Sequence, residues 1–168
     1  MIRIDKKHPD FNDVRFVLSA IGCDKTRPAF LRVKTQNGVM YATDGFRLHC
    51  TTLQMTIDDG LWDIVGNTAK EIILTPETEY MDYPDVIKVI PESNTPIIFE
   101  NRSNTTTVDI LIAKILRKIP DNQALNIDYL KAIIVPMGTF TVKQTGETFN
   151  PLLFESENKQ AVLAVLKI

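Results

Sequence analysis

A helical pattern of apolar residues marks the first regular element of the chain. Apolar side chains fall at i, i+3, i+4 and i+7 within one segment, at Val14, Val17, Leu18 and Ile21. This spacing places them on one stripe, so it predicts an amphipathic helix over residues 12–21. Asp10 or Asn12 can cap the start of this helix by accepting a hydrogen bond from a free amide, and Gly22 follows where a helix commonly ends.

Alternating apolar and polar residues then predict three consecutive strands, over residues 30–35, 39–43 and 47–53. Asn37-Gly38 separates the first two of these runs. This dipeptide is typical of a two-residue hairpin, because a type I′ turn needs positive φ at both of its central residues. Asp44-Gly45 forms a second tight turn before the third strand. The front part of the chain is therefore expected to be a helix followed by a three-stranded meander.

The same order of elements returns near the C-terminus. We expect a short helix over residues 127–134, with Asn126 in position to cap it. Strands follow over residues 139–144, 152–156 and 161–166, with a Thr145-Gly146 turn after the first. The two halves, about residues 1–92 and 93–168, form a pseudo-repeat. They predict a single α+β domain, residues 1–168, with antiparallel sheets.

The segment between the two halves is less regular. We expect a strand over residues 70–75 and find a β-rich run over residues 96–101. Residues 83–91 contain a proline near the start and another at the end. Residues 107–116 suit a buried strand by their β-branched content, but they could also make two turns of helix. We favour a strand for residues 107–116, because a hairpin across Ser103-Asn104 would then extend the sheet.

Composition and charge narrow the classes of function. The 168 residues are 44% hydrophobic, which is enough to bury one substantial core. A net charge of −2 and an isoelectric point near 5.7 exclude an overall basic surface that coats nucleic acid, but not a local basic face. No apolar run approaches the roughly 20 residues that span a bilayer, and residues 1–7 lack the apolar core of a signal peptide. We expect a cytoplasmic protein with no membrane contact.

Little in the sequence points to a cofactor or a catalytic centre. Cys23 and Cys50 form no Cys-x-x-Cys pair, and His8 and His49 complete no familiar metal-binding spacing. We therefore expect reduced, structural cysteines, no metal and no cofactor. A glycine-rich phosphate loop, a nucleophile elbow and the His-Glu-x-x-His motif are all absent from the sequence. The prediction is that the protein is not an enzyme.

Three fragments, in the same order along the chain, resemble one known family. Residues 41–48, Tyr-Ala-Thr-Asp-Gly-Phe-Arg-Leu, resemble the Ala-Thr-Asp-Gly-His-Arg-Leu signature in the middle domain of bacterial DNA polymerase III β sliding clamps, with Phe46 in place of the usual His. Residues 83–91 are similar to the linker into the family's last domain. Residues 152–155 and 162–168 are similar to its closing strand and apolar tail. The front half thus resembles the start of one clamp domain and the back half the end of another.

The resemblance implies a DNA clamp fold, reduced to one clamp-like domain, and a non-enzymatic function as a DNA-replication processivity or polymerase-tethering factor. The expected partners are a DNA polymerase or other proteins with a clamp-binding motif, together with double-stranded DNA. Further copies of the chain are expected to close a homo-oligomeric ring, which for a one-domain chain would take about six copies. The reduced size leaves a phage or mobile-element origin open.

The resemblance also places an apolar peptide-binding groove. The matching positions are Thr43, Gly45, Phe46, Arg47, Leu48, Pro84, Lys88, Val89, Val162, Ala164, Val165 and Leu166. Such a groove would take a Leu or Phe anchor of a short peptide. The alternative is that the aliphatic members are core residues of neighbouring strands and that Asp44 only stabilises a tight turn.

Four basic residues are candidates for DNA contact, because the resemblance places the clamp's helices on the inner wall of the ring. They are Arg15, Lys25, Arg27 and Lys131. The alternative is that they are solvated surface charges, offset by neighbouring acids. Two rival functions also stay open. One is a monomeric peptide-binding adaptor or decoy that encircles no DNA, and the other is a remnant with neither activity.

Overall fold

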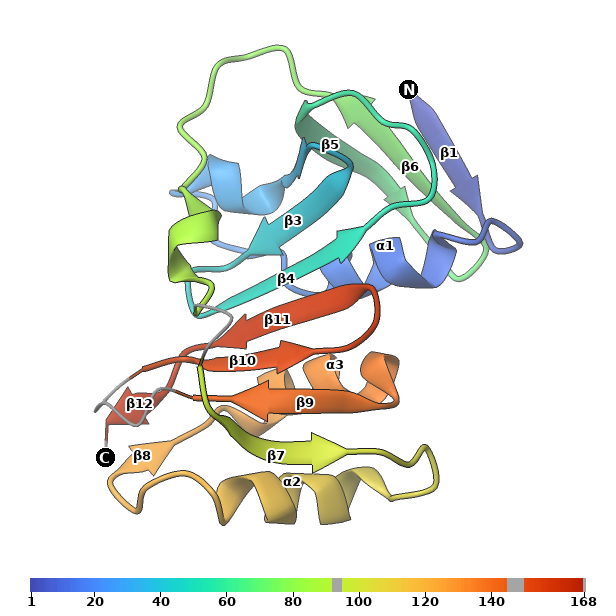
Figure 1. The fold of residues 1–168 in the computed structure, drawn as a ribbon. Helices are drawn as coiled ribbons and strands as arrows, with labels where there is room; N and C mark the ends of the chain where they lie inside the picture. Colours follow the sequence, from blue (N-terminus) through green and yellow to red (C-terminus); the bar gives the residue numbers. More distant parts are fainter. Residues whose placement is uncertain (92–94, 145–149, 168) are drawn as a thin grey trace. The chain divides into compact units, whose positions relative to one another are not determined.

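The chain folds into two compact units, Met1–Pro84 and Asp85–Ile168. The structure is a computed structural model, and it describes residues 1–91, 95–144 and 150–167 (Figure 1). Each unit contains antiparallel β-strands and at least one α-helix. The expectation of one clamp-like domain, with halves at about residues 1–92 and 93–168, stays a prediction.

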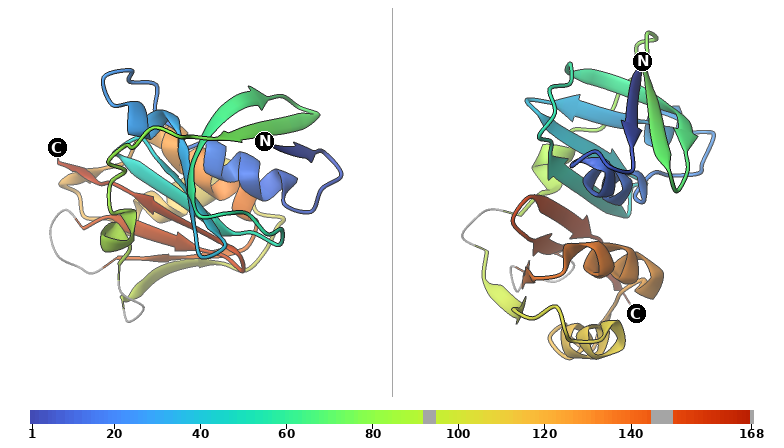
Figure 2. Two further views of the ribbon diagram at one scale, coloured as in Figure 1. Left: turned by 90° about the horizontal axis from the view of Figure 1, so that it is seen from above. Right: turned by 90° about the vertical axis from the view of Figure 1, so that its right-hand side faces the viewer.

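The first unit is a six-stranded antiparallel sheet with one α-helix. Its strands run in the order β1-β6-β5-β2-β3-β4, and α1 packs against β3 and β4 (Figures 1 and 2). A 3-10 helix, Pro28–Leu31, precedes β2. The elements are β1 (Ile2–Asp5), α1 (Phe11–Leu18), β2 (Val33–Gln36), β3 (Val39–Thr43), β4 (Arg47–Thr52), β5 (Gly60–Asn67) and β6 (Glu71–Pro76).

The helix and the hairpin predicted in this unit are confirmed. Helix α1 buries Val14, Val17 and Leu18 as its periodicity requires, but it ends before Ile21. Asn37 and Gly38 have φ of 52° and 74°, and the flanking strands pair with Gln36 opposite Val39. Positive φ at both central residues is the type I′ geometry that matches the right-handed twist of the two strands.

Two details of the first unit differ from the prediction. The strand expected over residues 30–35 begins only at Val33, because Pro28–Leu31 forms the 3-10 helix. Strands β1 and β5 were not predicted. Strand β1 pairs with β6, for example Ile4 opposite Ile72, and the short run around Ile4 shows too little alternation to identify a strand by itself.

A buried carboxylate joins the start of α1 to the segment after β4. Asp10 is fully buried, and its two oxygens accept hydrogen bonds from the backbone amides of Gln54 (2.9 Å) and Met55 (2.8 Å). Its backbone carbonyl accepts from the amide of Val14. Asp10 therefore occupies the N-cap position of α1, but its side chain accepts hydrogen bonds from a distant segment, so the predicted capping bond to the helix is wrong.

The second unit contains a four-stranded antiparallel sheet of order β11-β10-β9-β7 and a short β8–β12 pair. Helices α2 and α3 pack on each other, α2 against β7 and α3 against β11, and both lie on one face of the sheet (Figure 2). A 3-10 helix, Val86–Val89, opens the unit. Its elements are β7 (Ile97–Asn101), α2 (Val108–Leu116), β8 (Gln123–Ala124), α3 (Ile127–Met137), β9 (Phe140–Lys143), β10 (Leu152–Glu155), β11 (Lys159–Leu163) and β12 (Leu166–Lys167).

The expected strand over residues 107–116 is wrong, since Val108–Leu116 forms helix α2. Leu111, Ile112 and Ile115 make one buried stripe at helical spacing, while Asp109 and Lys114 are exposed. Burial of that stripe outweighs the weak intrinsic preference of β-branched residues for strands. The hairpin expected across Ser103-Asn104 is wrong for the same reason, because this segment is a turn that leads into the helix.

The second predicted helix is confirmed together with its cap. Asn126 Oδ1 accepts hydrogen bonds from the amides of Asp128 (3.0 Å) and Tyr129 (3.1 Å). Strands β9, β10 and β11 follow in the predicted order. The predicted Thr145-Gly146 turn lies outside the described residues. Within the described ranges, no helix has the length and apolar character needed to cross a bilayer.

Substitution of Asp10 tests the connection between α1 and the segment after β4. In Asp10→Ala the amides of Gln54 and Met55 lose a buried, charged acceptor, so we expect the free energy of unfolding to fall by about 2 kcal/mol. Urea titration followed by circular dichroism measures it. Asp58→Ala, which removes an exposed carboxylate from the same unit, should change stability by less than about 0.5 kcal/mol. Equal effects of the two substitutions would contradict the role assigned to Asp10.

Candidate functional site

The Thr43–Leu48 loop is held rigidly by its own side chains. Asp44 Oδ1 accepts hydrogen bonds from the amides of Phe46 (2.9 Å) and Arg47 (3.0 Å), and Oδ2 pairs with Arg47 Nε at 3.0 Å. The Thr43 hydroxyl donates to the Arg47 carbonyl (2.7 Å) and accepts from the Gly45 amide (3.0 Å). The loop between β3 and β4 therefore has one defined conformation, with Thr43 opposite Leu48 in the ladder.

Gly45 brings the loop backbone against a cation–aromatic pair. Its φ is +93°, and a Cβ atom there would lie 3.1 Å from Arg27 Nη1 and 3.3 Å from Phe30 Cε2. The guanidinium carbon of Arg27 lies 4.7 Å from the centroid of the Phe30 ring. We call these two side chains the Arg27–Phe30 stack. Any other residue at position 45 would be strained, because its φ would be positive. Its Cβ atom would also come too close to the Arg27–Phe30 stack.

The sequence interpretation missed Phe30 and assigned Arg27 to DNA alone. The Gly45 contact places both beside the loop that carries the sliding-clamp signature. No sequence signal identifies this pairing, because an Arg three residues before a Phe is common. What brings them together is the 3-10 helix Pro28–Leu31, whose last two residues were predicted to begin a strand.

The loop presents one apolar side chain to solvent. Phe46 is 53% exposed, whereas Leu48 is 2% exposed and belongs to the core of the unit. Thr43 is buried, and Arg47 is held by Asp44 with a largely buried side chain. Phe46 is therefore the apolar side chain of this loop that an incoming partner can reach.

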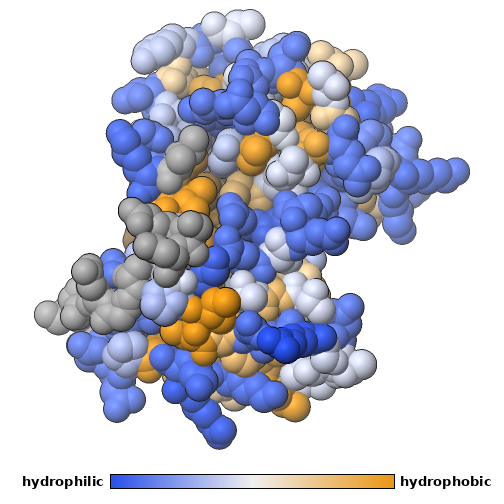
Figure 3. All heavy atoms as spheres, in the orientation of Figure 1, coloured by the Kyte–Doolittle hydropathy of each residue, from blue (hydrophilic) through white to orange (hydrophobic). Residues whose placement is uncertain are grey.

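The remaining predicted groove residues divide between the units. Pro84 closes the first unit and is half-buried. In the second unit, Lys88 is exposed and paired with Asp85 at 3.0 Å. Val89 and Leu166 expose 51% and 48% of their surface, Val162 is buried, and Ala164 and Val165 are intermediate. Figure 3 shows how apolar residues interrupt a mostly hydrophilic surface.

Tyr83 anchors the end of the first unit. Its ring is buried, and Lys34 Nζ lies 5.8 Å from the ring centroid. Burial raises the pKa of Tyr83 well above its usual value, and the Thr43 backbone opposes that rise. The segment leading to Pro84 is thereby packed against strands β2 and β3, which carry Lys34 and Thr43.

The cations predicted to contact DNA are all at the surface. Arg15 lies on α1, with its guanidinium 5.7 Å from the Phe11 ring centroid, Lys25 lies in the following loop, and Lys131 lies on α3. The sequence interpretation missed three further exposed cations in and just after the last turn of α2: Lys114, Arg117 and Lys118. They were missed because this segment was predicted to be a strand. Together with Lys131 they place four exposed cations on or next to two packed helices.

His49 is a buried histidine next to this loop. Its ring stacks on Phe16 with centroids 4.4 Å apart, and Nδ1 donates to the Phe16 carbonyl at 2.8 Å. Nε2 has no hydrogen-bond partner among the described residues, so a protonated ring would bury an unsatisfied donor. Burial, opposed by the Phe16 carbonyl, lowers the pKa of His49 to about 4. The ring is neutral at neutral pH.

Ser19 and His49 are adjacent but do not form a catalytic pair. Ser19 Oγ lies 3.1 Å from His49 Nδ1 and donates to the Phe16 carbonyl at 2.7 Å. Because a carbonyl oxygen can only accept, Nδ1 carries the proton and cannot act as a base for the Ser19 hydroxyl. Both groups instead donate to the Phe16 carbonyl near the end of α1.

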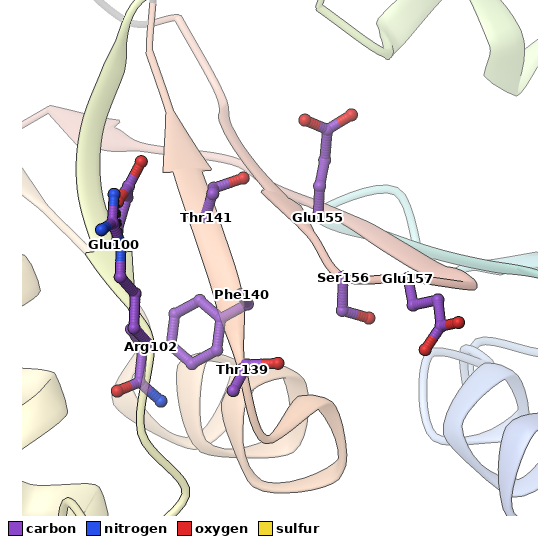
Figure 4. Close-up of a pocket in the computed structure, with 9 residues that line it drawn as sticks. Glu100, Arg102, Thr139, Phe140, Thr141, Glu155, Ser156 and Glu157 are labelled. Carbon is purple, nitrogen blue, oxygen red and sulfur yellow. Dashed lines mark hydrogen bonds and ion pairs between the residues drawn. The ribbon is translucent and has the colours of Figure 1, made fainter.

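One surface pocket of about 460 Å³ lies on the second unit (Figure 4). Its lining residues come from β7, β9, the end of β10 and the adjoining turns: Glu100, Asn101, Arg102, Thr139, Phe140, Thr141, Glu155, Ser156 and Glu157. Glu100 pairs with Arg102, and Glu155 pairs with Lys143. None of these residues was predicted as a site. Within the described part of the chain, no group of three His, Cys, Asp or Glu side chains could hold a metal ion.

Solved structures of sliding clamps resemble this chain over nearly its whole length. The β subunit of the Streptococcus pyogenes DNA polymerase matches with a TM-score of 0.65 at 12% identity, covering 99% of this chain and 66% of that one. The DNA polymerase sliding clamp of Pseudomonas aeruginosa matches with a TM-score of 0.62 at 12% identity and the same coverage. The β subunit of Borrelia burgdorferi DNA polymerase III gives 0.63 at 11% identity, covering 100% and 63%.

These matches show that the chain has the sliding-clamp fold, as predicted. No protein-family model and no curated protein matches it. At 11–12% identity the likeness is one of structure. The chain spans about two thirds of the length of the clamps that it matches, 66% in the first case.

The buried histidine makes the stability of the protein sensitive to acid. Because the folded-state pKa of His49 lies below its unfolded value of about 6.5, the unfolded state binds more protons as the pH falls from about 6.5 to about 4. The contribution of His49 to the free energy of unfolding is fully present above about pH 6.5. We expect about 2 kcal/mol of it to be lost as the pH falls from about 7 to about 5. His49→Phe should lack this part of the pH dependence in urea titrations. Parallel curves for the two proteins would contradict the assignment.

Proposed function

We propose that this chain is a sliding-clamp-like, non-enzymatic factor that tethers a DNA polymerase or another clamp-binding protein to DNA. The observation that carries the proposal is the sliding-clamp fold over 99% of the chain, combined with the signature loop Thr43–Leu48 held in one conformation. The solved structures are of proteins named DNA polymerase sliding clamp or β subunit. The same role in this chain would need a protein-binding surface and a DNA-facing surface.

The protein-binding surface is proposed to take a short peptide with apolar anchors. In the first unit, exposed Phe46 stands next to Gly45, whose backbone lies against the Arg27–Phe30 stack. An apolar anchor of the peptide that is buried against the Phe46 ring would contribute about 1.5–3 kcal/mol, which supports weak binding. Val89 and Leu166 of the second unit, which expose about half of their surface, are separate candidates for an apolar contact.

Substitution of Phe46 tests peptide binding. We expect Phe46→Asp to weaken binding of a fluorescent peptide with a Gln-x-x-Leu-x-Phe motif by at least about tenfold, because it places a charge where an apolar anchor would be buried. Fluorescence anisotropy measures the affinity. Val65→Asp, at a 61% exposed valine on β5, is the matched control and should bind normally. Leu48→Asp is unsuitable, since Leu48 is in the core. Unchanged binding by a folded Phe46→Asp protein would refute the assignment.

The DNA-facing surface is proposed to include α2 and α3. Their exposed cations Lys114, Arg117, Lys118 and Lys131 can contact phosphates without giving the whole protein a basic charge. Arg15 and Lys25 are the corresponding candidates on the first unit. Few phosphate contacts suit a protein that slides, because strong pairing at each position would oppose movement.

A circular template distinguishes encirclement from ordinary binding. If copies of the chain close around DNA, nicked circular DNA should retain the protein at moderate salt and should release it after linearisation. The combined Lys114→Gln, Arg117→Gln and Lys118→Gln variant should reduce retention and flatten its salt dependence. Retention can be followed by gel filtration of the DNA complex. Equal retention on linear DNA with free ends would exclude sliding by encirclement.

A second function is a monomeric adaptor or decoy that binds clamp-binding peptides and encircles nothing. This function would use the exposed Phe46 ring but would not need the cations of α2 and α3. Peptide binding without any retention on circular DNA, together with a monomeric mass by light scattering at all concentrations, would favour this adaptor over the tethering factor.

A further inference from the structure

The surface pocket of the second unit lies at one end of its sheet, where β7 and β10 end and β9 begins. Its volume of about 460 Å³ is in the range of small-molecule sites. Glu100 and Arg102 line one side, and Glu155, Ser156 and Glu157 line the other, with β9 between them (Figure 4). The pocket is therefore a space between two walls, and each wall carries a carboxylate.

The strand register fixes the distance between the two walls. Glu100 of β7 lies opposite Thr141 of β9, and Thr141 lies opposite Glu155 of β10. Neighbouring strands are about 4.8 Å apart, so the backbones of Glu100 and Glu155 are roughly 10 Å apart. Glu157 continues the second wall two residues beyond Glu155. A ligand that reaches both walls must therefore be elongated.

The pocket has more hydrogen-bond acceptors than its own donors occupy. Glu157 is exposed and has no hydrogen-bond or ion-pair partner among the described residues. Glu100 pairs with Arg102 through Oε2 alone, and 86% of the Arg102 side chain is exposed, so this pair contributes little and can open. Asn101, another lining residue, is 6% exposed. Its Nδ2 donates to the Gly138 carbonyl at 2.6 Å, which leaves Oδ1 without a partner in the described part of the chain. These oxygens can be satisfied by a ligand that donates hydrogen bonds.

Glu155 is part of the wall and is already satisfied. Its Oε1 accepts a hydrogen bond from Gln160 Nε2 at 3.0 Å, and its Oε2 pairs with Lys143, whose side chain is largely buried. Glu100 and Glu157 therefore remain for a ligand, one on each side of the pocket. Acids outnumber bases among the lining residues, so the pocket disfavours a phosphate or a carboxylate and favours a cation.

We propose that this pocket binds an aliphatic diamine or polyamine, with one ammonium group at Glu100 and another at Glu157. An ammonium group combines a positive charge with three N–H donors, which suit carboxylate and amide oxygens. Thr139 and Thr141 lie between the two walls, where the hydrocarbon chain of the ligand would pass (Figure 4). None of these residues belongs to the candidate peptide-binding or DNA-facing surface, so the inference goes beyond the proposed function.

Titration with ligands that differ in their number of amines tests the site. 1,4-Diaminobutane, butylamine and 1,4-butanediol have the same carbon chain, and two-dimensional proton–nitrogen NMR spectra report where each one binds. We expect the diamine to shift the amide signals of residues 100–102, 139–141 and 155–157. Its affinity should be about fivefold higher than that of butylamine, because the second ammonium group adds an ion pair. Butanediol should not bind.

Two charge-removing variants and a matched control assign the binding groups. Glu157→Gln should lower the affinity for the diamine about fivefold, to that of butylamine, and Glu100→Gln should do the same. Asp121→Asn removes an exposed carboxylate elsewhere in the second unit and should bind the diamine as the wild type does. The same spectra show whether each variant is folded.

Equal affinities for the diamine and butylamine would overturn the inference, as would unchanged diamine binding by a folded Glu157→Gln protein. Shifts spread over all the exposed acids of the chain would also overturn it, since they would show unspecific ion pairing. A blocked Lys-Lys dipeptide distinguishes a free amine from the side chains of a partner protein. If the dipeptide binds more tightly than the diamine, the pocket takes a protein partner and a free diamine is refuted.

Discussion

The carboxylate of Asp44 is the constraint on which the candidate site depends. It accepts hydrogen bonds from two successive loop amides and pairs with Arg47, so three groups that would otherwise need water are satisfied by one side chain. In the loop conformation that these bonds hold, the Gly45 backbone lies against Arg27 and Phe30, and the Phe46 ring is exposed. Without the Asp44 hydrogen bonds these side chains would belong to a loop of several conformations, and any partner would have to order it on binding.

Much of the fold could be predicted because local signals coincide with tertiary packing. The stripe of α1, the Asn37-Gly38 turn and the Asn126 cap each describe a local geometry that the folded protein keeps. Residues 108–116 have no such signal, since their β-branched side chains suit both helix and strand and only packing on α3 and β7 decides between them. Strand β1 could not be predicted, because its partner β6 lies about 70 residues away in sequence.

The candidate site was less predictable than the fold. The sequence identifies positions on a loop but not which side chains reach the surface, and two positions close in sequence illustrate the difference. Phe46 and Leu48 are both apolar, yet one is exposed and the other is core. The Arg27–Phe30 stack depends on a 3-10 helix, and the cations Lys114, Arg117 and Lys118 depend on the α2 assignment. In each case the missing information is the direction of a side chain, which follows from the element that carries it.

The hydrogen bonds of Asp10 have a consequence for synthesis of the chain. They join residues 44 and 45 positions apart, across the whole of β2, β3 and β4. Until residues 54 and 55 have been made, docking of α1 would bury the Asp10 carboxylate without these two hydrogen bonds, which disfavours docking. We therefore expect α1 to dock on the nascent strands only after residue 55 has left the exit tunnel. Until then the apolar stripe of α1 stays accessible to chaperones.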